Sequence, residues 1–269
     1  MSGPYALQTL STVKRIGLVG DLHGDAHQLR EVAEAMRARG LSVLVATGDF
    51  GFVDSRPMIS NQAWASEILA ENQLSLIFVD GNHDRLSDIY SSPVDATGYR
   101  WVASNMAHLP RGFRMRVAGG RTLGALGGAN SIDHPKADPL ESITPDDLVA
   151  LGTERVDILI GHDAPTPLPA LDQLLATTDR YWTDEGRAYA AAGREMFTRG
   201  FRQVRPELYV GGHFHTYIDE VVSFGDGADR FESRVVLLAD ASSGAGVSCA
   251  VLDLATLELE TFDLNGDRR

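Results

Sequence analysis

Short apolar runs recur along the first third of the chain, with segments of helical spacing between them. Residues 16–20, 41–46 and 76–79 are runs of the kind that form buried strands. Between the first two runs, residues 27–39 place apolar side chains three and four positions apart, which predicts a helix. Gly40 is a suitable residue to end that helix.

A second helix is expected to begin at Ser55-Arg56-Pro57, where proline falls in the first turn, and to run to about Asn72. The order strand, helix, strand, helix, strand favours parallel pairing, because such crossovers place helices over the faces of a sheet.

The pattern changes after residue 91. Residues 113–117 alternate apolar and basic side chains, as an edge strand does, and residues 121–126 are expected to pair with them. Thr144 starts a helix, because a proline and two acids follow this cap residue.

The rest of the chain contains both strand-like and helical segments. Strands are expected at 156–160, 208–210, 217–224, 234–238 and 247–254, and helices at 171–176 and 185–199. Because the chain ends in β-structure, we expect a second sheet. The predicted fold class is α/β (α+β): a two-sheet β-sandwich flanked by helices, with an N-terminal arm at 1–14 and a single domain at 15–269.

Composition narrows the function classes. The 269 residues suffice for one large domain, and 37 acidic against 24 basic residues give a net charge of −13. Such a surface repels a phosphate backbone, so stable nucleic-acid binding is not expected. The only cysteine, Cys249, excludes an internal disulfide and is expected to be a small buried strand residue.

Nothing in the sequence indicates a membrane protein. Residues 1–14 lack the apolar segment of a signal peptide, and no run approaches the roughly 20 apolar residues of a membrane span. We therefore expect a cytoplasmic protein.

Polar clusters follow five of the apolar runs. They are Asp21-Leu22-His23, Gly48-Asp49, Gly81-Asn82-His83-Asp84, Gly161-His162 and Gly212-His213-Phe214-His215. Because ligands bind beyond the carboxyl ends of parallel strands, these clusters can converge on one mouth. The candidate metal ligands are Asp21, His23, Asp49, Asn82, His162, His213 and His215.

This set of oxygen and nitrogen ligands, without a thiolate, suits Mn, Fe, Zn, Co or Ni, and we expect Mn first. Seven ligands are too many for one ion with open positions, so they indicate two divalent ions. Asp49 is the natural bridge because a carboxylate has two oxygens. Two dications less two ligand carboxylates leave a charge of roughly +2, which would attract phosphate despite the acidic surface.

His213 and His215 lie two positions apart. In an extended segment both would point the same way, about 6.5–7 Å apart. Paired metals lie about 3.5–4 Å apart, so each histidine could reach a different ion.

In order and spacing, the five clusters resemble the motif blocks of the calcineurin-like metallophosphoesterase superfamily, over residues 21 to 215. The resemblance implies a β-sandwich flanked by helices. It assigns Asp21, His23, Asp49 and His215 to one ion, and Asp49, Asn82, His162 and His213 to the other.

The same resemblance implies that His83 is not a ligand but lies beside the substrate. There it would stabilise the phosphoryl charge or protonate the leaving oxygen, while a bridging hydroxide attacks phosphorus in line. Asp84 or Asp54 could orient His83, and the sequence leaves this choice open.

Two residues near the clusters are candidate substrate contacts. Arg85 follows the central cluster directly, and His134 lies in a polar loop that could rim the pocket. For both, the alternative is an ordinary surface position.

Other side chains are expected to be structural. Asp25 is expected to cap a helix, and His27 to lie on a helix surface. Trp64, Trp101 and Trp182 are expected to pack, although a role in stacking on a base stays open for Trp182 or Tyr181.

The segment after the bridging aspartate separates the branches of the superfamily. Residues 50–56 depart from the Gly-Asp-x-Val-Asp-Arg-Gly pattern of protein Ser/Thr phosphatases and dinucleoside tetraphosphatases. The closing His-x-His cluster is similar to that of the phosphodiesterase branches. We therefore expect a small phosphorylated substrate, namely a phosphodiester such as a cyclic nucleotide, with phosphomonoesters as the alternative.

Two further alternatives fit less well. A repair-type nuclease would need a basic channel and a DNA-capping domain, which the net charge and the length disfavour. A non-catalytic scaffold would have lost ligands or His83, and none is lost. The sequence does not indicate an oligomeric state.

Overall fold

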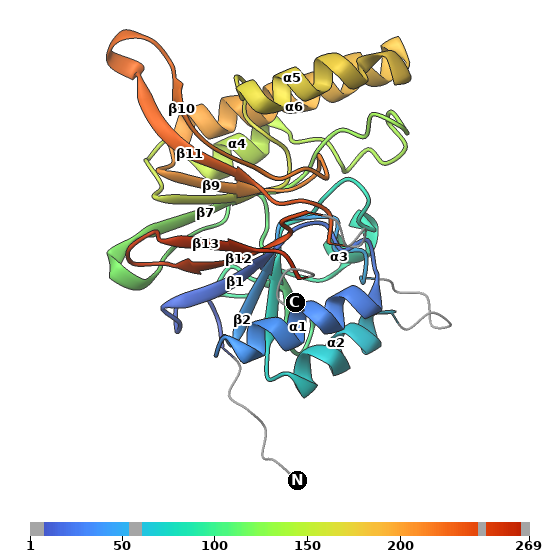
Figure 1. The fold of residues 1–269 in the computed structure, drawn as a ribbon, viewed down its shortest axis with the longest axis vertical. Helices are drawn as coiled ribbons and strands as arrows, with labels where there is room; N and C mark the ends of the chain where they lie inside the picture. Colours follow the sequence, from blue (N-terminus) through green and yellow to red (C-terminus); the bar gives the residue numbers. More distant parts are fainter. Residues whose placement is uncertain (1–7, 54–60, 242–245, 265–269) are drawn as a thin grey trace.

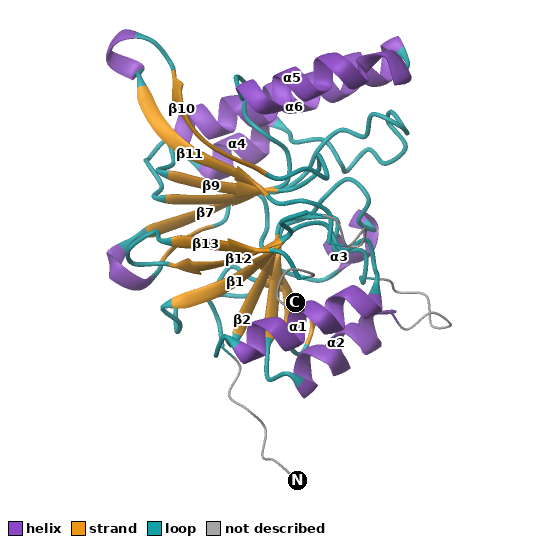
Figure 2. Ribbon diagram, in the orientation of Figure 1, coloured by secondary structure: helices purple, strands orange, loops and turns teal. Residues whose placement is uncertain are grey.

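Two β-sheets lie face to face with helices on their outer faces, in a computed structural model that describes residues 8–53, 61–241 and 246–264 (Figures 1 and 2). This arrangement confirms the two-sheet sandwich flanked by helices. The expected helix start at Ser55-Arg56-Pro57 lies outside the described residues.

Among the described residues, the first sheet has seven strands. In spatial order they are β13 (Leu259–Phe262), β12 (Cys249–Asp253), β1 (Arg15–Val19), β2 (Val43–Ala46), β3 (Ser75–Phe78), β5 (Met106–His108) and β4 (Arg100–Ala103). Strands β1, β2, β3 and β5 run parallel, as the alternation of strands and helices predicts.

The second sheet has six strands in the part of the chain that the structure describes. In spatial order they are β10 (Ile218–Phe224), β11 (Phe231–Leu237), β9 (Leu208–Gly211), β8 (Ile158–Gly161), β7 (Thr122–Leu126) and β6 (Arg114–Arg116). Strand β6 lies at the edge and pairs antiparallel with β7, as the alternating pattern of residues 113–117 predicts.

The expected second sheet is present, but the last two strands of the chain do not belong to it. β12 pairs antiparallel with β1, and β13 pairs with β12, so the last two strands belong to the first sheet. An apolar run predicts a strand, but its hydrogen-bonded neighbour depends on contacts between distant parts of the chain. Cys249 is fully buried in β12, as expected.

Alternate residues of the strands face two different cores. Ile16 and Leu18 of β1 are fully buried between the sheets, whereas Val19 belongs to the core beneath the helices. Gly17 also faces the helices, since a Cβ there would lie 2.4 Å from the Met36 sulfur. Each fully buried aliphatic side chain stabilises the fold by about 1.5–3 kcal/mol.

Helices α1 (Ala26–Ala38) and α2 (Asn61–Glu71) cover the first sheet, and the short α3 (Leu86–Ser91) lies near the strand ends (Figure 1). The expected cap of α1 is confirmed, because the Asp25 carboxylate accepts hydrogen bonds from the backbone N–H groups of His27 and Gln28. The His27 side chain is 75% exposed, as expected.

Helices α4 (Pro145–Leu151), α5 (Pro169–Thr178) and α6 (Asp184–Val204) cover the second sheet. Thr144 and Asp147 form a reciprocal capping box at the start of α4, which confirms the predicted helix start. Figure 1 shows α5 and α6 side by side and extending past the strand ends. An ion pair of 2.8 Å between Arg194 and Asp172 joins these two helices.

Within the part of the chain that the structure describes, none of the helices combines the length and the apolar character that crossing a membrane requires.

Candidate metal centre

Five loops meet at one edge of the two sheets, and they carry the five polar clusters. The loops follow β1, β2 and β3 in the first sheet and β8 and β9 in the second. Because the strands within each set are parallel, their carboxyl ends share an edge. Contacts such as the 3.3 Å distance between Asp49 Oδ2 and His162 Nε2 join the two sets.

The structure gathers six of the predicted ligands into two groups, each with its ligand atoms within 4.8 Å of one another. The groups are Asp21, His23 and His215, and Asp49, His162 and His213. The seventh, Asn82, places its Oδ1 3.2 Å from His162 Nε2 and so lies beside the second group. Asp49 lies in the second group only, so its sharing between two ions, which the resemblance implies, stays a prediction.

One carboxylate oxygen of Asp49 is buried without a hydrogen bond from a described residue. Its Oδ1 accepts a hydrogen bond of 2.8 Å from the His83 backbone N–H, but its buried Oδ2 has no hydrogen bond from any described residue. Burial by itself would raise the pKa of Asp49, yet the neighbouring His162 outweighs burial and keeps the pKa below its usual range. His162 Nε2 lies 3.3 Å from Asp49 Oδ2 but is not aligned for a hydrogen bond, and a divalent ion would satisfy this oxygen.

His162 is held with one nitrogen turned toward the second group. Its Nδ1 donates to the Thr47 carbonyl at 2.8 Å, which leaves Nε2 facing Asp49 and Asn82. Such a bond to the outer nitrogen orients a metal-binding histidine. Burial disfavours the charged imidazole, but the Asp49 and Asp21 carboxylates outweigh it and raise the pKa of His162.

His213 is held in the uncharged form. Burial, followed by the nearby His162, lowers the pKa of His213 to about 3. An uncharged imidazole is the form that binds a metal ion. Together these carboxylate, imidazole and amide groups fit a divalent ion of the manganese-to-zinc series.

Four of the predicted ligands adopt the left-handed backbone region, which is uncommon outside glycine. The φ angles are 46° at His23, 46° at Asp49, 68° at His213 and 52° at His215. The expectation of an extended segment at His213 and His215 is therefore wrong, although each histidine does join a different group. Strained conformations of this kind cluster at functional sites.

Glycines let the backbone come close to the ligands. A Cβ at Gly212 would lie 2.2 Å from Asp21 Oδ1, and one at Gly81 would lie 2.1 Å from Asp49 Oδ1. Any larger residue there would displace a ligand carboxylate.

His83 lies at the mouth of the centre with its side chain exposed, and its ring centroid is 5.5 Å from that of His23. Asp84, in contrast, is buried, and its two oxygens accept hydrogen bonds of 2.8 Å from the N–H groups of Gly51 and Gly81. Asp84 therefore fixes the loops that carry His83 and Asp49. Asp54, the other candidate partner of His83, lies outside the described residues.

A buried polar chain behind Asn82 was not found from the sequence. The Asn82 amide donates to Ser131 Oγ at 2.9 Å, and Ser131 donates to Glu141 at 2.9 Å. Glu141 also accepts a bond of 2.7 Å from the Tyr189 hydroxyl on α6. The chain turns the Asn82 oxygen toward His162, and no local motif marks it because its members are far apart in sequence.

A buried ion pair beside this chain was also missed. Asp80 Oδ2 accepts hydrogen bonds of 3.0 and 2.6 Å from Arg111, and Asp80 Oδ1 lies 3.0 Å from His108 Nε2. Arg111 further donates to the carbonyls of residues 140–142. Burial would raise the pKa of Asp80, but Arg111 and His108 outweigh it and hold that pKa below its usual range.

A hollow of about 1190 Å³ opens beside the metal centre and runs beneath α5 and α6. His83, His215 and Trp182 are among the residues that line it. Arg85 and His134, the candidate substrate contacts, are not among the described residues that line it. Arg85 pairs with Asp88 at 2.8 Å instead.

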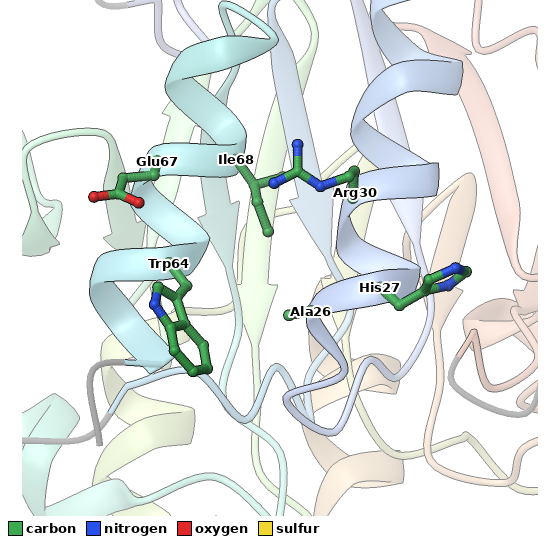
Figure 3. A pocket seen from close by; sticks show the side chains of 6 residues that line it. All are labelled: Ala26, His27, Arg30, Trp64, Glu67 and Ile68. Carbon is green, nitrogen blue, oxygen red and sulfur yellow. The ribbon is translucent and has the colours of Figure 1, made fainter. Parts of the chain in front are cut away.

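A smaller hollow of about 290 Å³ lies between α1 and α2 (Figure 3). Trp64, Arg30 and His27 line it, and no described residue lines both hollows. None of the predicted site residues falls in it.

Comparison with known proteins agrees with this geometry. The family model described as calcineurin-like phosphoesterase matches residues 14–217. No curated protein gave a significant match in sequence.

Two solved structures show the likeness in fold. The structure of TT1561 of Thermus thermophilus has a TM-score of 0.57 and 17% identity, covering 94% of this chain and 100% of that one. The structure of a dimetal phosphatase from Danio rerio (LOC 393393) has a TM-score of 0.54 and 13% identity, covering 94% of this chain and 99% of that one.

Proposed function

Since the chain belongs to the calcineurin-like phosphoesterase family, we propose that it is a metal-dependent enzyme that hydrolyses a small phosphodiester. The observation that carries the proposal is a pair of neighbouring ligand groups, the second of which includes Asp49, whose buried Oδ2 has no hydrogen bond from a described residue. A cyclic nucleotide is one substrate of this class.

The proposed cofactor is a pair of divalent ions, with Mn²⁺ as the first choice and Fe, Zn, Co or Ni as alternatives. Asp21, His23 and His215 would hold one ion, and His162, His213 and Asn82 the other, with Asp49 shared. Such ions, when bound, stabilise the phosphoryl charge and lower the pKa of water.

We assign proton transfer to the leaving oxygen to the His83 imidazole. The ring is exposed, lines the hollow and lies beside the first ligand group. Its backbone N–H is tied to Asp49, which fixes the ring's position relative to the proposed bridge. Asp84 acts through the loops that it holds rather than on the substrate.

The charged side chains on the wall of the hollow, apart from the proposed ions, favour a diester over a monoester. Its described walls carry six carboxylic and four arginine side chains. A diester brings one negative charge and a monoester up to two, so the walls repel the diester less.

Turnover of two model substrates tests the proposal. With Mn²⁺ added, bis-(p-nitrophenyl) phosphate should be hydrolysed with a higher kcat/KM than p-nitrophenyl phosphate. Release of p-nitrophenolate measures both reactions, and the metal content of the same sample is determined alongside. Activity on the monoester alone would reverse the ranking, and no turnover with two ions bound would rule out the enzyme.

Replacing His83 by alanine should lower kcat about 10²-fold, which is the lower end of the effect of a general acid. The metal content should not change, because His83 is not placed as a ligand. His27→Ala is the matched control, since this exposed histidine starts α1 and should leave turnover as it is. Equal activity of the two variants would remove His83 from the mechanism.

A further inference from the structure

The hollow beneath α5 and α6 is far larger than a phosphate group needs. Its volume of about 1190 Å³ exceeds the roughly 300–1,000 Å³ of most small-molecule pockets. Asn82, His83, His213 and His215 of the metal centre line the same hollow, so its interior is continuous with the proposed reaction site. A substrate bound at the centre therefore has room for a large group beneath the two helices.

The wall away from the centre is partly apolar and includes an aromatic surface. Trp182 is 40% exposed and Leu174 is 38% exposed, and both line the hollow, as does Leu175. Phe214 also lines it, but its ring centroid is 4.7 Å from that of His213, at the metal centre. A partly exposed indole that lines a hollow is suited to stacking on a flat ring.

Trp182 is held in place by the start of α6. Its backbone N–H donates to the Asp179 carbonyl at 3.2 Å, and the next residue, Thr183, caps the helix by accepting from the Gly186 N–H at 3.0 Å. Both bonds fix the backbone on either side of the indole. A residue held in this way loses little entropy when a ligand binds.

The charged groups of the wall do not form a site for a polyanion. Arg194 pairs with Asp172 at 2.8 Å and donates to the carbonyls of Ala164 and Pro165, and Arg187 pairs with Asp184. With acids in excess over arginines, the hollow does not attract a run of phosphates. The occupant is therefore neutral or weakly charged apart from its one phosphate.

We propose that the hollow binds a flat aromatic group carried by the phosphoester substrate, with its face against Trp182 and its edge near Leu174. The inference rests on the proposed function, and it narrows the substrate class to aromatic phosphodiesters. The metal centre would hold the phosphate while the aromatic group supplies binding energy beneath the helices.

Binding of three phosphonates tests the inference without turnover, because their P–C bond is not hydrolysed. The probes are methylphosphonate, octylphosphonate and (2-naphthylmethyl)phosphonate, titrated by calorimetry into the Mn²⁺-loaded full chain. The naphthyl probe should bind about tenfold more tightly than the methyl probe, and more tightly than the octyl probe.

Variants then locate the ring. Trp182→Ala should weaken naphthyl binding about tenfold and leave methylphosphonate binding unchanged, and Leu174→Ala should weaken naphthyl binding less. Trp64→Ala is the matched control, because Trp64 is 53% exposed in the separate hollow between α1 and α2 (Figure 3). This control should bind all three probes as the wild type does.

The outcomes separate the two proposals. The aromatic site is wrong if the naphthyl probe binds no more tightly than the methyl probe, or if Trp182→Ala binds the naphthyl probe as tightly as the wild type does. Hydrolysis of bis-(p-nitrophenyl) phosphate would in that case still support the proposed enzyme. Tighter binding of the octyl probe would likewise overturn the aromatic site in favour of an aliphatic one. If nothing is hydrolysed with two ions bound, the proposed function fails and this inference with it.

Discussion

Replacing Asp49 by asparagine is expected to lower kcat/KM about 10⁴-fold. Asp49 belongs to the second ligand group, and the proposed assignment shares it with the first. Asparagine keeps an oxygen for the bond from the His83 N–H but replaces the free Oδ2 with an amide nitrogen, which does not bind a metal ion. Each lost ion forfeits several kcal/mol of transition-state stabilisation, and each 1.36 kcal/mol is a factor of ten.

The same variant has a readout that does not depend on turnover. Ions that bind only the folded chain raise its free energy of unfolding, by about 2.7 kcal/mol when the ion concentration is about a hundred times Kd. The unfolding temperature rises as a result. Mn²⁺ should raise the unfolding temperature of the wild type and not that of Asp49→Asn. With a chelator present Asp49→Asn should unfold at a lower temperature than the wild type, because it removes the carboxylate that pairs with His162 at 3.3 Å. The readout is therefore the shift that Mn²⁺ adds to each protein.

Asp25→Asn is the matched control for this experiment. Asp25 caps α1 and is not part of the two ligand groups, and asparagine caps a helix about as well as aspartate. The control should keep both turnover and the response to Mn²⁺. If Asp49→Asn kept either turnover or the response to Mn²⁺, Asp49 would not be needed to bind a metal ion.

The proposed centre could be predicted from the sequence because its information is local. Each ligand lies shortly after an apolar run. Buried parallel strands bring such positions to one edge of a sheet, whatever the conformation of the loops. The pairing of β12 with β1 was not predictable in this way, because any apolar strand could fill that place. The left-handed conformations at His213 and His215 were missed because residue spacing carries no information about φ.

The supporting contacts were missed for a different reason. Asp80, His108 and Arg111 are each ordinary in their own segments, and only the fold brings them together. The same is true of Ser131 and Glu141 behind Asn82. Residues that contact each other only in the folded chain, and lie far apart in the sequence, do not form a short sequence motif.

The arginine in this supporting layer gives the largest expected effect on stability. Arg111→Met should destabilise the fold by about 3–5 kcal/mol, because it leaves the fully buried Asp80 carboxylate without its main counter-charge. It also removes the donor to the carbonyls of residues 140–142. At about 2–4 °C per kcal/mol for a chain of this size, the unfolding temperature should fall by roughly 6–20 °C.

The matched control for Arg111→Met is the same substitution at an exposed ion pair. Arg30 lies 2.7 Å from Glu71 on the helical surface, where solvent already screens both charges, so Arg30→Met should leave the unfolding temperature unchanged. Thermal unfolding followed by circular dichroism compares the two variants with the wild type. A small, equal shift for both would contradict the prediction, because losing Arg111 would then destabilise the fold no more than losing an exposed arginine. A large shift for Arg111→Met alone would show that the edge of the sheets holding the ligand loops depends on this buried charge pair.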